Sequence, residues 1–241
     1  MTDNQKTFLE TCRDLYMGGL QADILPFWLE HGLDREHGGV YTCLDRDGRL
    51  MDGTKSVWFQ GRFGFVMSRA YRTAGGRKEW LDAAKSALEF IERHCIDVDG
   101  HMFFSVTADG RPVQKRRYVF SECFAAMAMA EYSAASGDAG YAEKAVSMFR
   151  NILRMLSTPG FLPPKTYIPS QAHSITMMLI NVAMVVKEVS SDPVLDARID
   201  RSIDALARYF MHPEFRTILE TVGPGGEFID TCDGRVINPG H

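Results

Sequence analysis

The sequence predicts an all-α fold, a ring of helix pairs decorated by short β-hairpins, and three observations support it. The tripeptide Asp-Gly-Arg recurs after short apolar stretches, with its glycine at Gly48, Gly110 and Gly234. The first two glycines are 62 residues apart, and the third lies 124 residues further on, which is twice that distance. The segments between them have helical periodicity. A period this regular is typical of a repeat architecture.

Each Asp-Gly-Arg predicts a hairpin, because glycine adopts the positive φ that a tight turn needs. The three stretches are "GGVYTCLDRDGRLMD", "GHMFFSVTADGRPVQ" and "GEFIDTCDGRVINPG". A fourth unit would centre on position 172, where the proline-rich "GFLPPKTYIPSQAH" is interpreted as a degenerate copy.

The helices expected between these loops are of two kinds. Those that follow a loop are rich in apolar and small residues, and those that precede a hairpin have one charged face. This alternation favours an inner ring of buried helices inside an outer, solvated ring. The ranges expected are 5–31, 55–73, 78–94, 118–135, 139–156, 170–189 and 193–211.

Composition excludes several classes of function. Hydrophobic residues make up 45% of the chain and the net charge is −4, so there is no basic excess to bind nucleic acid or an anionic membrane. No apolar run reaches the roughly 18 residues of a membrane span, and the N-terminus lacks a signal-peptide pattern, which predicts a cytoplasmic protein. The five cysteines form no CxxC pair, and the histidines suggest no metal triad, so no metal site is expected.

Four motifs carry a resemblance to a known family. They are "FWLEHGLDREHGGVYTCLDRDGR", "KSVWFQGR", "RYVFSECFAAMAMAEY" and the C-terminal "GRVINPGH". Together they resemble the N-acylglucosamine 2-epimerases from about residue 27 to the last residue. The resemblance implies an (α/α)6 barrel with its active site in the central cavity. The chain is then expected to be one domain, 1–241, that forms roughly the first two-thirds of such a barrel.

The resemblance also implies a reaction, the interconversion of N-acetylglucosamine and N-acetylmannosamine by removal and return of the proton on C2. His241 is the expected proton-transfer residue, and Arg62 is the expected ligand of the carbonyl or enolate oxygen. Arg62 also stands out without the family, because a charge on an otherwise apolar helix needs a partner or a wet cavity. A structural ion pair is the alternative for Arg62, and a terminal residue without a role is the alternative for His241.

Further substrate contacts are expected from Lys55, Trp58, Phe120 and Glu122. Lys55, either Trp58 or Phe59, and Arg62 are expected to share one helical face. The two aromatic rings can stack on a sugar or belong to the core, and Glu122 can accept from a sugar hydroxyl or pair with Arg62 or Arg117. His173 is interpreted as a helix-start residue.

The sugar carries its own activating carbonyl, so no cofactor is required, although some family members respond to nucleotides such as ATP. Two other functions stay open: an aldose–ketose isomerase or cellobiose- or mannose-type 2-epimerase on the same barrel, and an inactive chain that binds sugar or a partner. In the family pattern, a glutamate and a second histidine lie beyond the positions that match this chain. Activity of the 241 residues alone is therefore doubtful. An open barrel edge would also expose apolar helices, which predicts a homo-oligomer.

Overall fold

The computed structural model describes residues 1–115, 118–163 and 166–237. The chain forms two compact units. The first comprises Met1–Lys115 with Ala135–Gly137, and the second comprises the described residues of Arg116–Ala134 and Asp138–His241. The expectation of a single domain over 1–241 stays a prediction.

The first unit begins with a long helical segment. Helix α1 (Asp3–Gly19) starts with a capping box made by Thr2 and Gln5, and it contains no buried residue. Short π-helical and α-helical turns then continue it, namely Leu20–Ile24, α2 (Leu25–Phe27) and Trp28–Gly32. The expected helix over 5–31 is therefore confirmed, with local π-helical widening.

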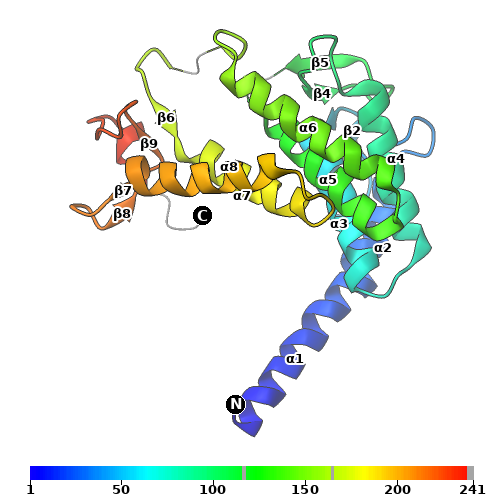
Figure 1. The fold of residues 1–241 in the computed structure, drawn as a ribbon. Coiled ribbons are helices and arrows are strands. Elements are labelled where there is room, and N and C mark those ends of the chain that lie inside the picture. Colours follow the sequence, from blue (N-terminus) through cyan, green and yellow to red (C-terminus); the bar gives the residue numbers. More distant parts are fainter. Residues whose placement is uncertain (116–117, 164–165, 238–241) are drawn as a thin grey trace. The chain divides into compact units, whose positions relative to one another are not determined.

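Helices α3 (Val57–Thr73) and α4 (Lys78–His94) pack together as a pair (Figure 1). Their bounds agree with the expected 55–73 and 78–94. The apolar stripe of α4 is buried along its length, from Trp80 through Leu88 to Ile91, whereas Lys85 and Glu89 are exposed. This one-sided burial is what its amphipathic pattern predicts.

Two hairpins of the first unit are where the sequence places them. The strands β1 (Cys43–Leu44) and β2 (Leu50–Asp52) flank Gly48, and β4 (Phe103–Val106) and β5 (Pro112–Lys115) flank Gly110. Both glycines have positive φ, 86° and 90° respectively, as the tight turns require. The strand β3 (Lys55–Ser56) adds to the second hairpin, giving an antiparallel sheet in the order β3-β4-β5.

The second unit is also mainly helical. Helix α5 is buried at every position from Ser121 to Ser133, as expected of an inner helix, whereas α6 and α8 each have an exposed charged face. Helices α7 and α8 pack together as a pair, and a π-helical turn, Leu206–Phe210, extends α8. The bounds are α5 Phe120–Ser136, α6 Ala139–Ser157, α7 His173–Lys187 and α8 Pro193–Ala205.

The strands of the second unit differ from the sequence-based expectation. β6 (Gln171–Ala172) pairs with β9 (Thr221–Val222), and β7 (Met211–His212) pairs with β8 (Thr217–Ile218). Within its described residues, the predicted copy around 172 therefore has no hairpin of its own.

The hairpin predicted at Gly234 is wrong. Asp233–Arg235 form a single 3-10 turn, and the residues after it pair with a distant segment instead of folding back on their own. The amide of Glu220 donates to the carbonyl of Val236, and Leu219 forms a bridge with Ile237. Among the described residues, no helix is both long and apolar enough to cross a membrane.

Candidate functional site

The first turns of α3 carry two of the predicted site residues. Trp58 is half-buried, and its ring packs edge-on against Phe104 of β4, with the centroids 5.2 Å apart. Arg62 follows one turn later on the same face of the helix and is exposed. The β3 strand leads directly into α3, so the sheet fixes where this helix begins.

Lys55, in β3, is wholly buried. Its ammonium donates to Asp34 Oδ2 and to the carbonyl of Gly38, both at 2.7 Å, and to the carbonyl of Ala108 at 2.9 Å. The same ammonium lies 4.1 Å from the ring centroid of Phe90. A lysine ammonium has three hydrogens, and the fold uses all of them. In this geometry, no hydrogen of the Lys55 ammonium is therefore left to donate to a sugar in the contact that the sequence predicts.

The charge of Lys55 is held by Asp34, which is 3% exposed. Burial by itself would raise the pKa of Asp34, but hydrogen bonds from Lys55 and from the amides of His37 and Glu36 lower it below its usual value. Burial, together with a hydrogen bond to Asp34, raises the pKa of the neighbouring Tyr41 to about 12. Asp34 is therefore a buried anion that ties a loop to the base of α3.

A second buried anchor on α3 is Gln60, which the sequence reasoning did not single out. Its Oε1 accepts from the amide of Val40 at 2.9 Å, and its Nε2 donates to the carbonyl of Val40 at 2.6 Å. The two residues are wholly buried. The sequence could have indicated this anchor, because Gln60 is an amide in the otherwise mostly apolar helix "VWFQGRFGF" and a buried polar group requires a partner.

In the second unit, Glu122 and Phe120 begin α5. Glu122 is completely buried in the first turn, where the positive end of the helix dipole favours a carboxylate. Phe120 is half-buried and stacks on Tyr118, with ring centroids 5.8 Å apart. Arg117, one expected partner of Glu122, lies outside the described residues, and the expected pairing with Arg62 stays a prediction.

His173 is the first residue of α7, as the sequence predicts. Its amide donates to the carbonyl of Glu220 at 2.8 Å, and its Nδ1 lies 3.8 Å from the Glu220 carboxylate. The imidazole is 2% exposed and packs edge-on against Phe210. The helix start is thus anchored to the segment before β9.

A pocket of about 490 Å³, with both polar and apolar walls, opens beside this anchor. Its wall includes the carboxylates of Glu220 and Asp233 and the hydroxyls of Ser170, Ser174 and Thr221. Such a lining can donate to and accept from a polyhydroxylated ligand. The sequence reasoning missed this pocket, because its walls come from segments about 50 residues apart.

His241, the predicted proton-transfer residue, lies outside the described residues. Within the described ranges, no group of three or more His, Cys, Asp or Glu side chains is arranged to hold a metal ion.

Comparisons with known proteins agree with the motifs. The chain is 37% identical to human N-acylglucosamine 2-epimerase over 229 residues, which are 90% of this chain and 53% of the human protein. It is 35% identical to cellobiose 2-epimerase of Ruminococcus albus over 135 residues, which are 55% of this chain and 34% of that protein. The chain thus spans about half the length of the human relative, and its matched part covers about a third of the bacterial one.

A solved structure establishes the fold. Cellobiose 2-epimerase from Bacillus thermoamylovorans superposes with a TM-score of 0.82 at 20% identity, covering 91% of this chain and 61% of that one. The predicted (α/α)6-barrel architecture is confirmed over this length. The family model described as N-acylglucosamine 2-epimerase (GlcNAc 2-epimerase) matches residues 39–241. The chain belongs to the N-acylglucosamine 2-epimerase family.

Proposed function

We propose that the protein containing this chain interconverts N-acetylglucosamine and N-acetylmannosamine. The observation that carries the proposal is the extent of the similarity. The match to human N-acylglucosamine 2-epimerase runs over 229 residues, whereas the match to the Ruminococcus albus cellobiose 2-epimerase stops at 135. An epimerase or isomerase of unmodified sugars is therefore not favoured.

The chemistry requires a proton to leave and return at C2. In the open-chain sugar this carbon lies next to a carbonyl, so its proton is weakly acidic and the sugar needs no redox cofactor. A base removes the proton on one face and an acid returns one on the other, and histidine suits both roles because its pKa lies near neutral pH. His241 is assigned to one of these steps.

Arg62 is assigned to the oxygen that gains charge when the C2 proton leaves. A guanidinium presents a planar fork of donors to such an oxygen. Arg62 is exposed on α3, where a ligand can reach it, and Trp58 offers a half-buried ring one turn earlier. Phe120 offers a second half-buried ring from α5. Glu122 and Lys55 are completely buried, which supports a role for both in positioning neighbouring groups.

The test follows deuterium at C2. The full gene product that contains this chain is incubated in D2O with N-acetylmannosamine, N-acetylglucosamine, cellobiose or mannose, and exchange and products are followed by proton NMR. The proposal predicts exchange and epimerisation of the two N-acetyl sugars at rates well above those of cellobiose and mannose. Faster turnover of cellobiose or mannose would assign the alternative epimerase or isomerase, and sugar binding without exchange would assign a non-catalytic role.

Regulation and assembly belong to the same proposal. A nucleotide such as ATP is an expected effector, and the assay above with and without ATP tests it.

Self-association is expected because α1 exposes a run of large apolar side chains: Phe8, Leu9, Leu15 and Tyr16. Sedimentation of the wild type and of Leu15→Glu tests this, since a wild-type monomer contradicts it. A cytoplasmic location stays a prediction.

A further inference from the structure

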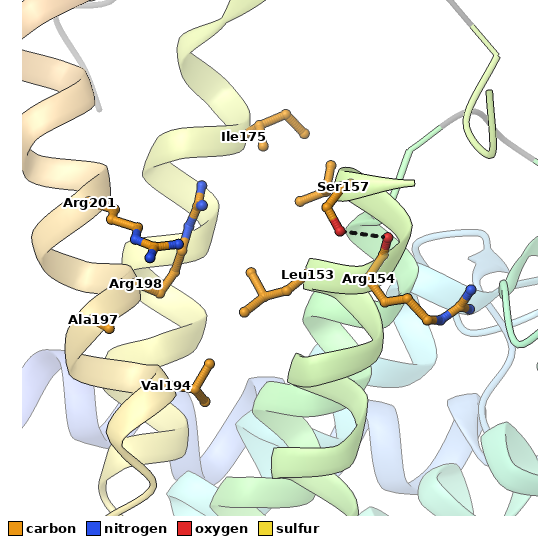
Figure 2. Close-up of a pocket in the computed structure, with 9 residues that line it drawn as sticks. Leu153, Arg154, Ser157, Ile175, Val194, Ala197, Arg198 and Arg201 are labelled. Carbon is orange, nitrogen blue, oxygen red and sulfur yellow. Dashed lines mark hydrogen bonds between the residues drawn. The ribbon is translucent and has the colours of Figure 1, made fainter. Parts of the chain in front are cut away.

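A groove in the second unit has no part in the proposed reaction. It has a volume of about 530 Å³ and is walled by α6, the start of α7 and one face of α8 (Figure 2). Its apolar wall includes Leu153, Leu156, Ile175 and Val194. Arg198 and Arg201 line it from α8 and are three positions apart, so they lie on the same face of the helix.

Neither arginine has a protein counter-charge in the groove. No acidic side chain of the described residues lines it. Nε of Arg198 is buried and has no hydrogen-bond partner among the described residues. Among those residues, neither Arg198 nor Arg201 forms an ion pair. Burial, and after it the charge of Arg201, lowers the pKa of Arg198. Two neighbouring cations thus face one hollow with unused donors.

Several of the surrounding charges are engaged elsewhere. Arg154 turns out of the groove, where it donates to Asn151 and lies over the ring of Phe161. On α8 itself, Asp196 pairs with Lys187. The acid that precedes the helix, Asp192, pairs with Arg150 and caps the helix. The acids at the start of α8 are therefore bound to other cations and do not neutralise the two guanidinium groups.

We propose that this groove binds the phosphate group of a small organic phosphate, with Arg198 and Arg201 as the phosphate ligands. A phosphate monoester carries nearly two negative charges at neutral pH and three strong acceptor oxygens, which match two guanidinium forks. A single carboxylate would leave one of the two cations without a counter-charge.

The size and wall of the groove indicate the rest of the ligand. About 530 Å³ lies within the usual range of small-molecule sites. A water molecule's share of liquid volume is about 30 Å³, so a bare phosphate ion would fill only a small part of the space. The apolar side chains from α6 and α7 would then contact an apolar or aromatic body attached to the phosphate.

Calorimetric titration of the purified chain tests this with three probes: phenyl phosphate, inorganic phosphate and benzoate. We expect phenyl phosphate to bind at least ten-fold more tightly than the other two. Arg198→Gln and Arg201→Gln should each weaken phenyl phosphate binding about ten-fold or more. Ala197→Trp, which fills the groove without changing its charge, should abolish binding.

The control is Arg208→Gln, which removes the same charge from an exposed arginine outside the groove wall. It should leave the affinity within two-fold of wild type, and circular dichroism confirms that each variant is folded. Benzoate binding as tight as that of phenyl phosphate would overturn the assignment to phosphate. Inorganic phosphate binding as tight as that of phenyl phosphate would overturn the inference that the ligand has an organic body. If Arg208→Gln weakened phenyl phosphate binding as much as Arg198→Gln and Arg201→Gln, the effect would come from the overall charge, and the proposed site would be overturned. None of these outcomes depends on epimerase activity.

Discussion

The imidazole of His31 lies so close over Gly48 that a β-carbon on this glycine would come within 2.3 Å of the ring. His94 lies over Gly110 in the same way, again at 2.3 Å. Each histidine also packs on a phenylalanine one helical turn earlier, with ring centroids 5.0 Å apart in both cases. The sequence period of the first two Asp-Gly-Arg motifs is thus a structural period, in which a helix end closes over a hairpin turn.

This contact predicts that the two glycines cannot be replaced. Gly48→Ala and Gly110→Ala each put a β-carbon into an imidazole and also force a positive φ on alanine. We expect each to lower the free energy of unfolding by about 1–3 kcal/mol. Urea denaturation of the purified chain measures the loss.

The matched control for these variants is Gly137→Ala. Gly137 has φ 78°, but a β-carbon added to it would meet no atom within 4 Å, so this variant carries only the backbone cost. It should lose about 1 kcal/mol. Equal losses in all three variants would show that the histidines do not contribute, and a partial recovery in Gly110→Ala with His94→Ala would show that they do.

The sequence predicts most of the fold because its helices are strongly patterned. The expected range 78–94 coincides with α4, where the charged and apolar faces are well separated. The same reasoning fails at Gly234, although its tripeptide is identical to those at Gly48 and Gly110. A hairpin needs a partner strand, and Val236 pairs with Glu220 instead. Long-range pairing of this kind leaves no local signal.

The candidate site is less predictable for a related reason. The sequence places Lys55 on one helical face with Trp58 and Arg62 and so predicts a sugar contact. In the structure Lys55 lies in β3, before the helix begins, and its ammonium is bound by Asp34, which lies 21 residues away. The charged face of 193–211 is typical of a solvated outer helix, so the sequence gives no sign that Nε of Arg198 is buried. Burial of individual polar atoms depends on packing that helical periodicity does not encode.

Breaking the Lys55–Asp34 pair should be costly. Lys55→Met leaves a buried carboxylate without its cation, and removal of one partner of a buried pair typically costs about 3–5 kcal/mol. We expect Lys55→Met combined with Asp34→Asn to lose clearly less than the sum of the two single variants, because the uncompensated charge is gone. Urea denaturation of all four proteins measures this coupling, and strict additivity would contradict it.

The lowered pKa of Asp34 predicts a pH dependence of stability. A carboxylate whose pKa is lower in the folded chain contributes stability above its unfolded pKa of about 3.9. That contribution is lost as the pH falls through the folded value. We expect the unfolding free energy to fall less steeply below pH 4 in Asp34→Asn than in the wild type. Urea midpoints at several acidic pH values measure the slope, and Asp47→Asn, in an exposed turn, is the control.

Asp192 should matter to α8 in two separable ways. Its carboxylate accepts from the amide of Val194 as the helix cap and forms a bidentate pair with Arg150. Asp192→Ala removes both contacts and should cost about 1–2 kcal/mol. Arg150→Ala removes only the pair, whose arginine is exposed, and should cost less than about 1 kcal/mol. Thermal melts compare the two, and an equal loss would show that the cap contributes nothing.

Arg62→Ala should remove activity from the full gene product without unfolding it. If Arg62 holds the developing oxyanion, losing this donor should lower kcat about 10²–10³-fold, since one such donor is typically worth about 3–4 kcal/mol. Arg62→Lys should recover only part of the rate, because an ammonium lacks the planar fork. The melting temperature should change little, since Arg62 is exposed on α3. Epimerisation of N-acetylmannosamine is measured beside Arg72→Ala, an exposed arginine in the last turn of the same helix. An Arg62→Ala protein that melts much earlier but keeps its kcat would make Arg62 a structural residue.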